Sequence, residues 1–212
     1  MSLERTPGTA TRPSGAEALL ARFAVLHPPV STAGAAVTIV LRDGSSEVET
    51  LLIERTVSPE DPASGNVALP GGRVEGNDGS LAATALRELN EEVGLGASDL
   101  VGPLRFVGAS LARRFGLHVG VFAACLAPTA GPPRIGSPEE VAHVFWLPRS
   151  ALEATRLVGQ QIDGAERRVL ATVHDNHVVW GFTRRILREF FELPSEDGTD
   201  GPAFAHPPPP PG

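Results

Sequence analysis

Apolar residues alternate with polar ones, or form short continuous runs, along much of the chain, and both patterns are typical of β-strands. The residues between the first two runs, 42–45, contain an Asp-Gly pair that favours a hairpin turn. The stretch 116–126 is almost entirely apolar, which indicates a strand covered on both faces. We predict strands over residues 35–41, 48–54, 66–69, 104–110, 116–126 and 141–147, and a late hairpin over residues 168–173 and 177–179.

Other apolar positions recur every three or four residues, which is the spacing of one face of an α-helix. In the last such stretch, Phe182, Ile186, Phe190 and Leu193 form one apolar stripe. Strands and helices mixed in this order indicate an α/β fold in which a sheet lies between helices. We predict helices over residues 18–26, 80–93, 150–155 and 182–193.

The predicted helix over residues 80–93 has three carboxylates close together near its end. At about 100° per residue, Glu88, Glu91 and Glu92 fall within little more than a quarter turn, beside an apolar arc. Neighbouring like charges cost a few tenths of a kcal/mol per pair, and the helix dipole disfavours anions at the C-terminus. A sequence that accepts both costs is expected to use the carboxylates. Carboxylate oxygens are suitable ligands for hard divalent cations such as Mg²⁺.

This helix and the segment before it resemble the signature box of the Nudix hydrolases. Residues 71–78 read Gly-Gly-Arg-Val-Glu-Gly-Asn-Asp, and residues 87–95 read Arg-Glu-Leu-Asn-Glu-Glu-Val-Gly-Leu. The second part matches the box at every fixed position. In the first part, Asp78 stands where the family usually has Glu, and eight residues separate it from Arg87 where seven are usual. The departure concerns the loop, and the metal-binding half is intact.

The resemblance implies a Nudix-type α/β/α sandwich with a mixed β-sheet and a box that binds Mg²⁺ or Mn²⁺. It also implies hydrolysis of a diphosphate linked to another group. Glu88 and Glu92 would be the main metal ligands, and Glu91 would hold or orient a second ion. The backbone carbonyl of Gly71 is a further candidate ligand. Arg87 is expected to brace a carboxylate in the catalytic site.

The base that activates water varies among Nudix hydrolases and often lies outside the box. Glu139 and Glu140 are the best external candidates because they lead into a strand that could flank the helix. A solvated pair at the start of the strand is the alternative interpretation, and Glu91 is the alternative base. Histidines in apolar strands or beside turns are expected to be packing or surface residues.

Two further segments are similar to coenzyme A diphosphatases. Residues 51–56 read Leu-Leu-Ile-Glu-Arg-Thr, and residues 179–187 read Val-Trp-Gly-Phe-Thr-Arg-Arg-Ile-Leu. Arg55 in the first segment is a candidate substrate-binding residue that contacts phosphate, with a strand-end salt bridge as the alternative. The second arginine of that upstream motif is absent, because residues 57–64 contain none.

This likeness implies coenzyme A or an acyl-CoA as substrate, cleaved to adenosine 3′,5′-bisphosphate and a phosphopantetheine. The alternatives are an ADP-ribose or dinucleotide polyphosphate pyrophosphatase and a non-catalytic Nudix-like domain that binds a ligand. In each case the partner is a small nucleoside-diphosphate compound. A homodimer is expected because enzymes of this family are often dimers.

Composition limits the remaining possibilities. The chain has 212 residues with 42% hydrophobic residues, which suits one domain over residues 16–194. Residues 1–15 and the Pro-rich residues 195–212 are expected to be flexible tails. The formal net charge of −7 argues against nucleic-acid binding through a basic surface.

Cysteine content and hydropathy point to a cellular location. Cys125 is the only cysteine, which excludes an internal disulfide and indicates a buried strand residue in a reducing compartment. No apolar run approaches the length of a membrane span, and no secretory signal is visible near the N-terminus. A cytoplasmic protein without a membrane partner is therefore expected.

Overall fold

The fold comes from a computed structural model that describes residues 14–58, 64–162, 164–194 and 204. The predicted tails lie almost entirely outside these residues. Among the described residues, no helix is both long enough and apolar enough to span a bilayer.

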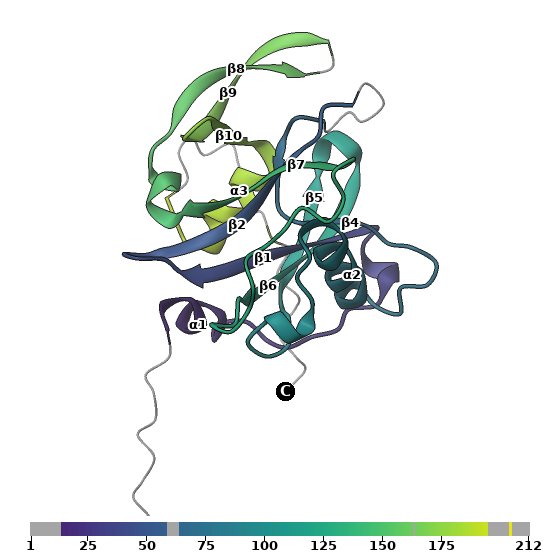
Figure 1. The fold of residues 1–212 in the computed structure, drawn as a ribbon. Coiled ribbons are helices and arrows are strands. Elements are labelled where there is room, and N and C mark those ends of the chain that lie inside the picture. Colours follow the sequence, from purple (N-terminus) through teal and green to yellow (C-terminus); the bar gives the residue numbers. More distant parts are fainter. Residues whose placement is uncertain (1–13, 59–63, 163, 195–203, 205–212) are drawn as a thin grey trace, which may run out of the picture.

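The centre of the fold is a mixed sheet of seven strands (Figure 1). The order is β3-β2-β1-β6-β5, with β4 paired to β1 and β7 paired to β2. Strands β1 and β6 are parallel, whereas the other pairs are antiparallel. The strands are β1 (Ala35–Asp43), β2 (Val48–Arg55), β3 (Val67–Ala68), β4 (Gly71–Arg73), β5 (Arg105–Ala112), β6 (Leu117–Cys125) and β7 (Val141–Pro148).

Helices cover both faces of this sheet. Helix α2 (Leu81–Val93) packs on one face, and α1 (Gly15–Leu20) and α3 (Gly181–Phe190) pack on the other. Successive residues of a strand point to opposite faces, so the side chains of β1 divide between two apolar clusters. Ala36 and Val40 contact the α2 layer, while Ile39 and Leu41 contact the layer of α1 and α3. The predicted α/β/α sandwich with a mixed sheet is therefore confirmed.

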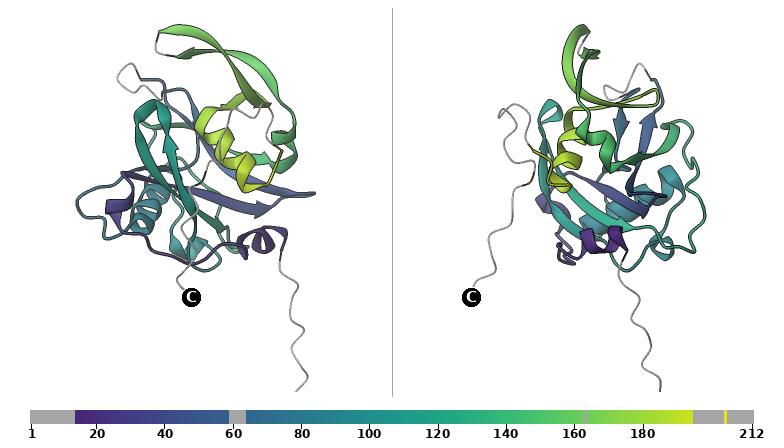
Figure 2. Two further views of the ribbon diagram at one scale, coloured as in Figure 1. Left: turned by 180° about the vertical axis from the view of Figure 1, so that it is seen from behind. Right: turned by 90° about the vertical axis from the view of Figure 1, so that its left-hand side faces the viewer.

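A smaller sheet of three strands lies beside the sandwich, in the order β10-β9-β8. The strands are β8 (Arg156–Ile162), β9 (Ala165–His174) and β10 (His177–Trp180). The hairpin of β8 and β9 extends away from the body of the molecule (Figure 2). The sequence predicts the β9–β10 hairpin but not β8, because much of β8 is exposed and has no regular apolar alternation.

Several predicted boundaries are wrong for identifiable reasons. The leading helix covers Gly15–Leu20, not residues 18–26, because Ser14 and Glu17 form a capping box that starts it earlier. The chain then leaves the helix, and the Ala24 carbonyl accepts a hydrogen bond from the Phe106 N–H. The helix predicted over residues 150–155 is a 3₁₀ helix. The 3₁₀ helices are Val30–Thr32, Ala97–Asp99, Arg113–Phe115 and Arg149–Glu153.

Candidate active site

The glycine pair of the box, together with Arg73, forms strand β4. This strand pairs with the beginning of β1, so Arg73 lies opposite Ala35. Gly71 has φ 151°, and a Cβ there would lie 2.6 Å from the Val37 Cα. A Cβ on Gly72 would lie 2.6 Å from the Glu88 Cδ. Both glycines are needed because β4 passes so close to β1 and to α2.

Helix α2 is fixed at both ends. The Ser80 side chain accepts a hydrogen bond from the Ala83 N–H at the start, and Gly94 ends the helix with φ 68°. Carbonyls of the last turn accept hydrogen bonds from the loop that precedes β7. The N–H of Gly136 donates to the Glu92 carbonyl, and the Ser137 hydroxyl donates to the Glu91 carbonyl. The carboxylate-bearing turn is thus held between β4 and this loop.

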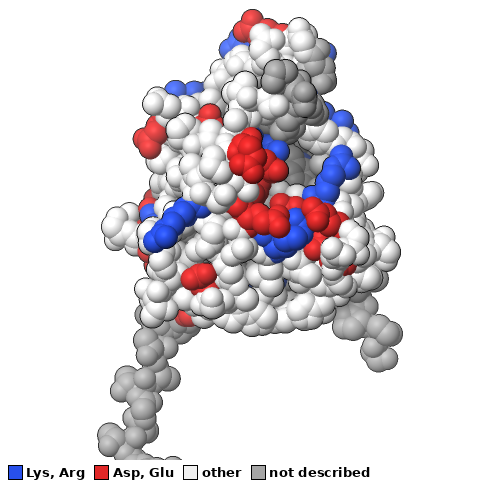
Figure 3. Space-filling model, turned by 45° about the vertical axis from the view of Figure 1, so that its right-hand side comes forward, with Lys and Arg blue, Asp and Glu red and all other residues white. Residues whose placement is uncertain are grey.

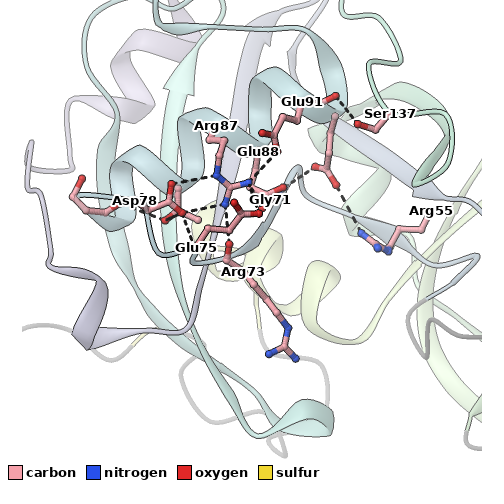
Figure 4. Close-up of polar contacts among 12 residues, drawn as sticks. Arg55, Gly71, Arg73, Glu75, Asp78, Arg87, Glu88, Glu91 and Ser137 are labelled. Carbon is pink, nitrogen blue, oxygen red and sulfur yellow. Dashed lines mark hydrogen bonds and ion pairs between the residues drawn. The ribbon is translucent and has the colours of Figure 1, made fainter.

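Arg87 connects the carboxylates of the box (Figure 4). Its Nη1 donates to Glu88 Oε1 and to Glu91 Oε2, each at 2.9 Å. Its Nε and Nη2 donate to the two carboxylate oxygens of Asp78 at 3.2 and 3.1 Å. Nη2 also donates to the Arg73 carbonyl at 2.9 Å. Arg87 thus holds three carboxylates of the box, and its contribution to catalysis stays a prediction.

Asp78 is the main anchor of this arginine. Its side chain is only 6% exposed, and it also accepts hydrogen bonds from the Thr84 hydroxyl and the Glu75 N–H. Hydrogen bonding from Arg87 is the largest cause that lowers the pKa of Asp78 to about 2. Asp78 therefore contacts Arg87 directly, although its side chain is shorter than the usual Glu.

Glu92 is the most buried carboxylate of the site, at 1% exposed. Its Oε2 accepts a hydrogen bond from the Gly71 N–H at 2.8 Å. Its Oε1 has no hydrogen-bond partner among the described residues, and the nearest cation is Arg55 Nη1 at 3.7 Å. Burial raises the pKa of Glu92 to about 8, because an unsolvated carboxylate is costly.

Glu140 lies near enough to Glu88 and Glu92 to affect their pKa values. Its negative charge contributes to raising the pKa of Glu88 and of Glu92, although burial is the larger cause for both. The Glu140 side chain itself is exposed. Figure 3 shows carboxylates gathered around basic atoms in the middle of one face, beside a recess in the surface. The structure thus brings together residues from β2, β4, α2 and the turn before β7.

The predicted site residues therefore lie close together. Gly71 contacts Glu92 through its N–H, and its carbonyl as a metal ligand stays a prediction. Arg55 lies beside Glu92, so the alternative of a salt bridge at the strand end describes its contact here. The burial of Glu92 and the position of Arg73 next to Arg87 were not predicted, because both depend on how β4 pairs with β1.

His177 of β10 packs against β7 and β2. His177 stacks on Phe145 with ring centroids 3.9 Å apart, and its Nδ1 lies 2.6 Å from Glu54 Oε2. This pair joins β10 to β2. It follows from the alternation of β2 that Glu54 points to the opposite face of the sheet from Arg55.

The donor set of the site fits a hard divalent cation. Within the described ranges, no three side chains of Asp, Glu, His or Cys are grouped closely enough to form a complete ligand set. Mg²⁺ is commonly bound through one or two carboxylates and keeps several waters. Glu92 Oε1, buried without a hydrogen bond, and the adjacent Glu88 provide such a pair.

Comparison with known proteins identifies the family. A family model described as the NUDIX domain matches residues 32–171. Over 144 residues, the chain is 38% identical to a Yersinia pestis (strain Pestoides F) protein described as "Uncharacterized Nudix hydrolase NudL". That match covers 66% of this chain and 69% of the relative.

A solved structure of a MutT/nudix family protein from Enterococcus faecalis has the same fold. The TM-score is 0.50 at 18% identity, over 85% of this chain and 69% of that one. The family match and the description of the relative identify a hydrolase that acts on pyrophosphate bonds. The chain belongs to the Nudix hydrolase family, whose members generally use divalent metal ions and act on small nucleotide conjugates.

The two glycines of β4 give a prediction that separates folding from site geometry. In Gly72→Ala the new Cβ meets only the movable end of Glu88, so we expect a folded protein with displaced carboxylate and activity reduced at least about tenfold. In Gly71→Ala the Cβ meets the backbone of β1 at an unfavourable φ, so we expect a loss of stability of about 1–3 kcal/mol. Urea denaturation and diphosphate hydrolysis of both variants measure the difference. A Gly72→Ala variant with full activity would contradict the placement of Glu88.

Proposed function

We propose that this chain is a Mg²⁺- or Mn²⁺-dependent diphosphatase of coenzyme A or acyl-CoA, with its site in a single domain of residues 16–194. The observation that supports metal-dependent cleavage most directly is Glu92, a buried carboxylate with one oxygen that has no hydrogen bond to any described residue. The coenzyme A assignment rests on the resemblance of residues 51–56 and 179–187 to that branch of the family. A cytoplasmic homodimer is the assembly we propose.

The residues around Glu92 suit distinct parts of the reaction. Glu88 and Glu92 would hold the cation, which when bound supplies Lewis-acid stabilisation of charge on the phosphate oxygens. Arg55, whose Nη1 lies 3.7 Å from Glu92 Oε1, would orient a diphosphate oxygen through charge-assisted hydrogen bonds. Asp78 and Arg87 would keep Glu88 in place between helix and strand.

Glu140 is the base that we favour for taking the proton from the attacking water. Its carboxylate is exposed and electrostatically coupled to Glu88 and Glu92. Glu91, the alternative base, is bound to Arg87 at 2.9 Å. The Glu91 oxygen that accepts this hydrogen bond is less available to a water molecule.

Product-resolved chromatography tests the proposal. Coenzyme A, acetyl-CoA and ADP-ribose are incubated with the protein, with Mg²⁺, with Mn²⁺ and with EDTA. We expect metal-dependent formation of adenosine 3′,5′-bisphosphate and a phosphopantetheine, faster than cleavage of ADP-ribose. Cleavage of ADP-ribose alone would keep the metal-dependent chemistry and reject the coenzyme A assignment. Tight binding of these compounds with no cleavage under any metal condition would favour a ligand-binding domain.

A further inference from the structure

Arg73 is fixed to the site through its backbone while its side chain points elsewhere. Its carbonyl accepts the hydrogen bond from Arg87, and its residue pairs with Ala35 of β1. Because the Cβ of Gly72 would face Glu88, the next residue along β4 projects from the opposite side of the strand. Figure 4 shows the Arg73 side chain leading away from the carboxylates.

The face toward which Arg73 projects carries a small apolar cluster. Ala35, its cross-strand neighbour, packs with Ala112 and Val119, and the cluster is bordered by Phe182 of α3. The guanidinium of Arg73 is exposed and has no hydrogen bond or ion pair with any residue in the described part of the chain. It stands at the edge of this largely buried cluster, one residue from the glycine that lies against Glu88.

An exposed arginine side chain with no partner among the described residues can bind an anion. The nearby acidic residues of the box do not engage it, since Asp78, Glu88 and Glu91 are all bound to Arg87. Guanidinium groups bind phosphate through two parallel hydrogen bonds. The diphosphate that is cleaved belongs at the carboxylates, on the other side of β4, so the anion at Arg73 is a separate one.

We propose that Arg73 is a specificity-determining residue that binds a phosphate group of the substrate outside the cleaved diphosphate. In coenzyme A this group is the 3′-phosphate of the ribose, so the inference rests on the proposed function and extends it. Arg73 would thereby provide a second phosphate contact in a chain whose residues 57–64 lack the second arginine of the upstream motif.

Paired substrates test this assignment. The Arg73→Gln variant is compared with the wild type on coenzyme A and on 3′-dephospho-coenzyme A, which differ only in the phosphate in question. We expect kcat/KM for coenzyme A to fall about tenfold or more and that for the dephospho compound to change less than twofold. Arg149→Gln is the matched control. Arg149 follows β7 beside the beginning of β2, whereas Arg55 of the site is at the end of β2, and Arg149 pairs with Glu153. Equal losses on both substrates, or no loss on either, would overturn the proposal.

A binding measurement keeps this test separate from the proposed reaction. Adenosine 3′,5′-bisphosphate and AMP contain no diphosphate, and calorimetry in EDTA measures their affinities without metal or turnover. We expect the wild type to bind the bisphosphate about tenfold more tightly than AMP and Arg73→Gln to lose this preference. If coenzyme A is not cleaved but this preference exists and depends on Arg73, the proposed reaction fails and the phosphate contact stands. A wild type without the preference would overturn the contact itself.

Discussion

Replacement of Glu92 by glutamine is expected to reduce kcat for diphosphate hydrolysis at least about a hundredfold, while the fold stays intact. A metal ion stabilises developing charge by several kcal/mol, and each 1.4 kcal/mol is worth about a factor of ten in rate. The amide keeps an oxygen that can accept the Gly71 N–H, so the link between α2 and β4 persists. The variant lacks only the negative charge that a cation requires.

Thermal unfolding provides the second measurement for this variant. Without metal, Glu92→Gln should be at least as stable as the wild type, because no carboxylate remains to be buried. Saturating Mn²⁺ should raise the Tm of the wild type, since a ligand that binds only the folded state stabilises it. The variant should show little of this increase. Glu153→Gln, at an exposed glutamate remote from the box, is the control that should behave like the wild type. Near-normal turnover by a folded Glu92→Gln protein would reject the metal assignment.

Replacement of Arg87 by glutamine is expected to lower the free energy of unfolding by about 2–4 kcal/mol. Removing one partner of a buried ion pair commonly costs about 3–5 kcal/mol, and Arg87 is partly exposed. The change leaves the Asp78 side chain, which is 6% exposed, without its main partner. Urea denaturation in EDTA measures the loss without interference from bound metal.

A double-mutant cycle with Asp78→Asn separates this pair from the rest of the network. The double variant should be more stable than the sum of the single losses predicts, by about 0.5–3 kcal/mol. The pKa of Asp78 is lowered to about 2 from its ordinary 3.8. The stabilisation is therefore present above about pH 4 and is lost as the pH falls through 2, so wild type and Arg87→Gln should converge in acid. Additive losses would show that Asp78 and Arg87 act independently.

Much of the fold could be predicted because its elements have clear local signals. The apolar run that becomes β6 is buried almost throughout, and the stripe of Ile186 and Phe190 packs against the sheet. Strand β8 escaped prediction because an exposed ribbon buries too little to require an apolar pattern. The type of an element was therefore predictable where burial of one face makes apolar residues recur at a regular spacing. The first and last residues of the elements were harder to predict.

The site shows the same division. The spacing of Glu88 and Glu92 predicts that both belong to one face of a helix, and both lie at β4. Their different environments could not be predicted, because the burial of Glu92 depends on β4, which approaches from the other side. Likewise, the direction of Arg73 follows from strand pairing, which no spacing in the sequence reveals.

The loop that caps the end of α2 links two parts of the site mechanically. Gly136 and Ser137 bind the carbonyls of the residues that bear the box carboxylates, and Glu140 follows within one turn, with its N–H donating to the Ser137 carbonyl. A shift of α2 would therefore carry Glu140 with it. Insertions before Arg134, whose N–H binds the Val93 carbonyl, would lengthen the surface loop without altering the distance between Glu140 and the box carboxylates. An insertion between Ser137 and Glu140 would change that distance directly.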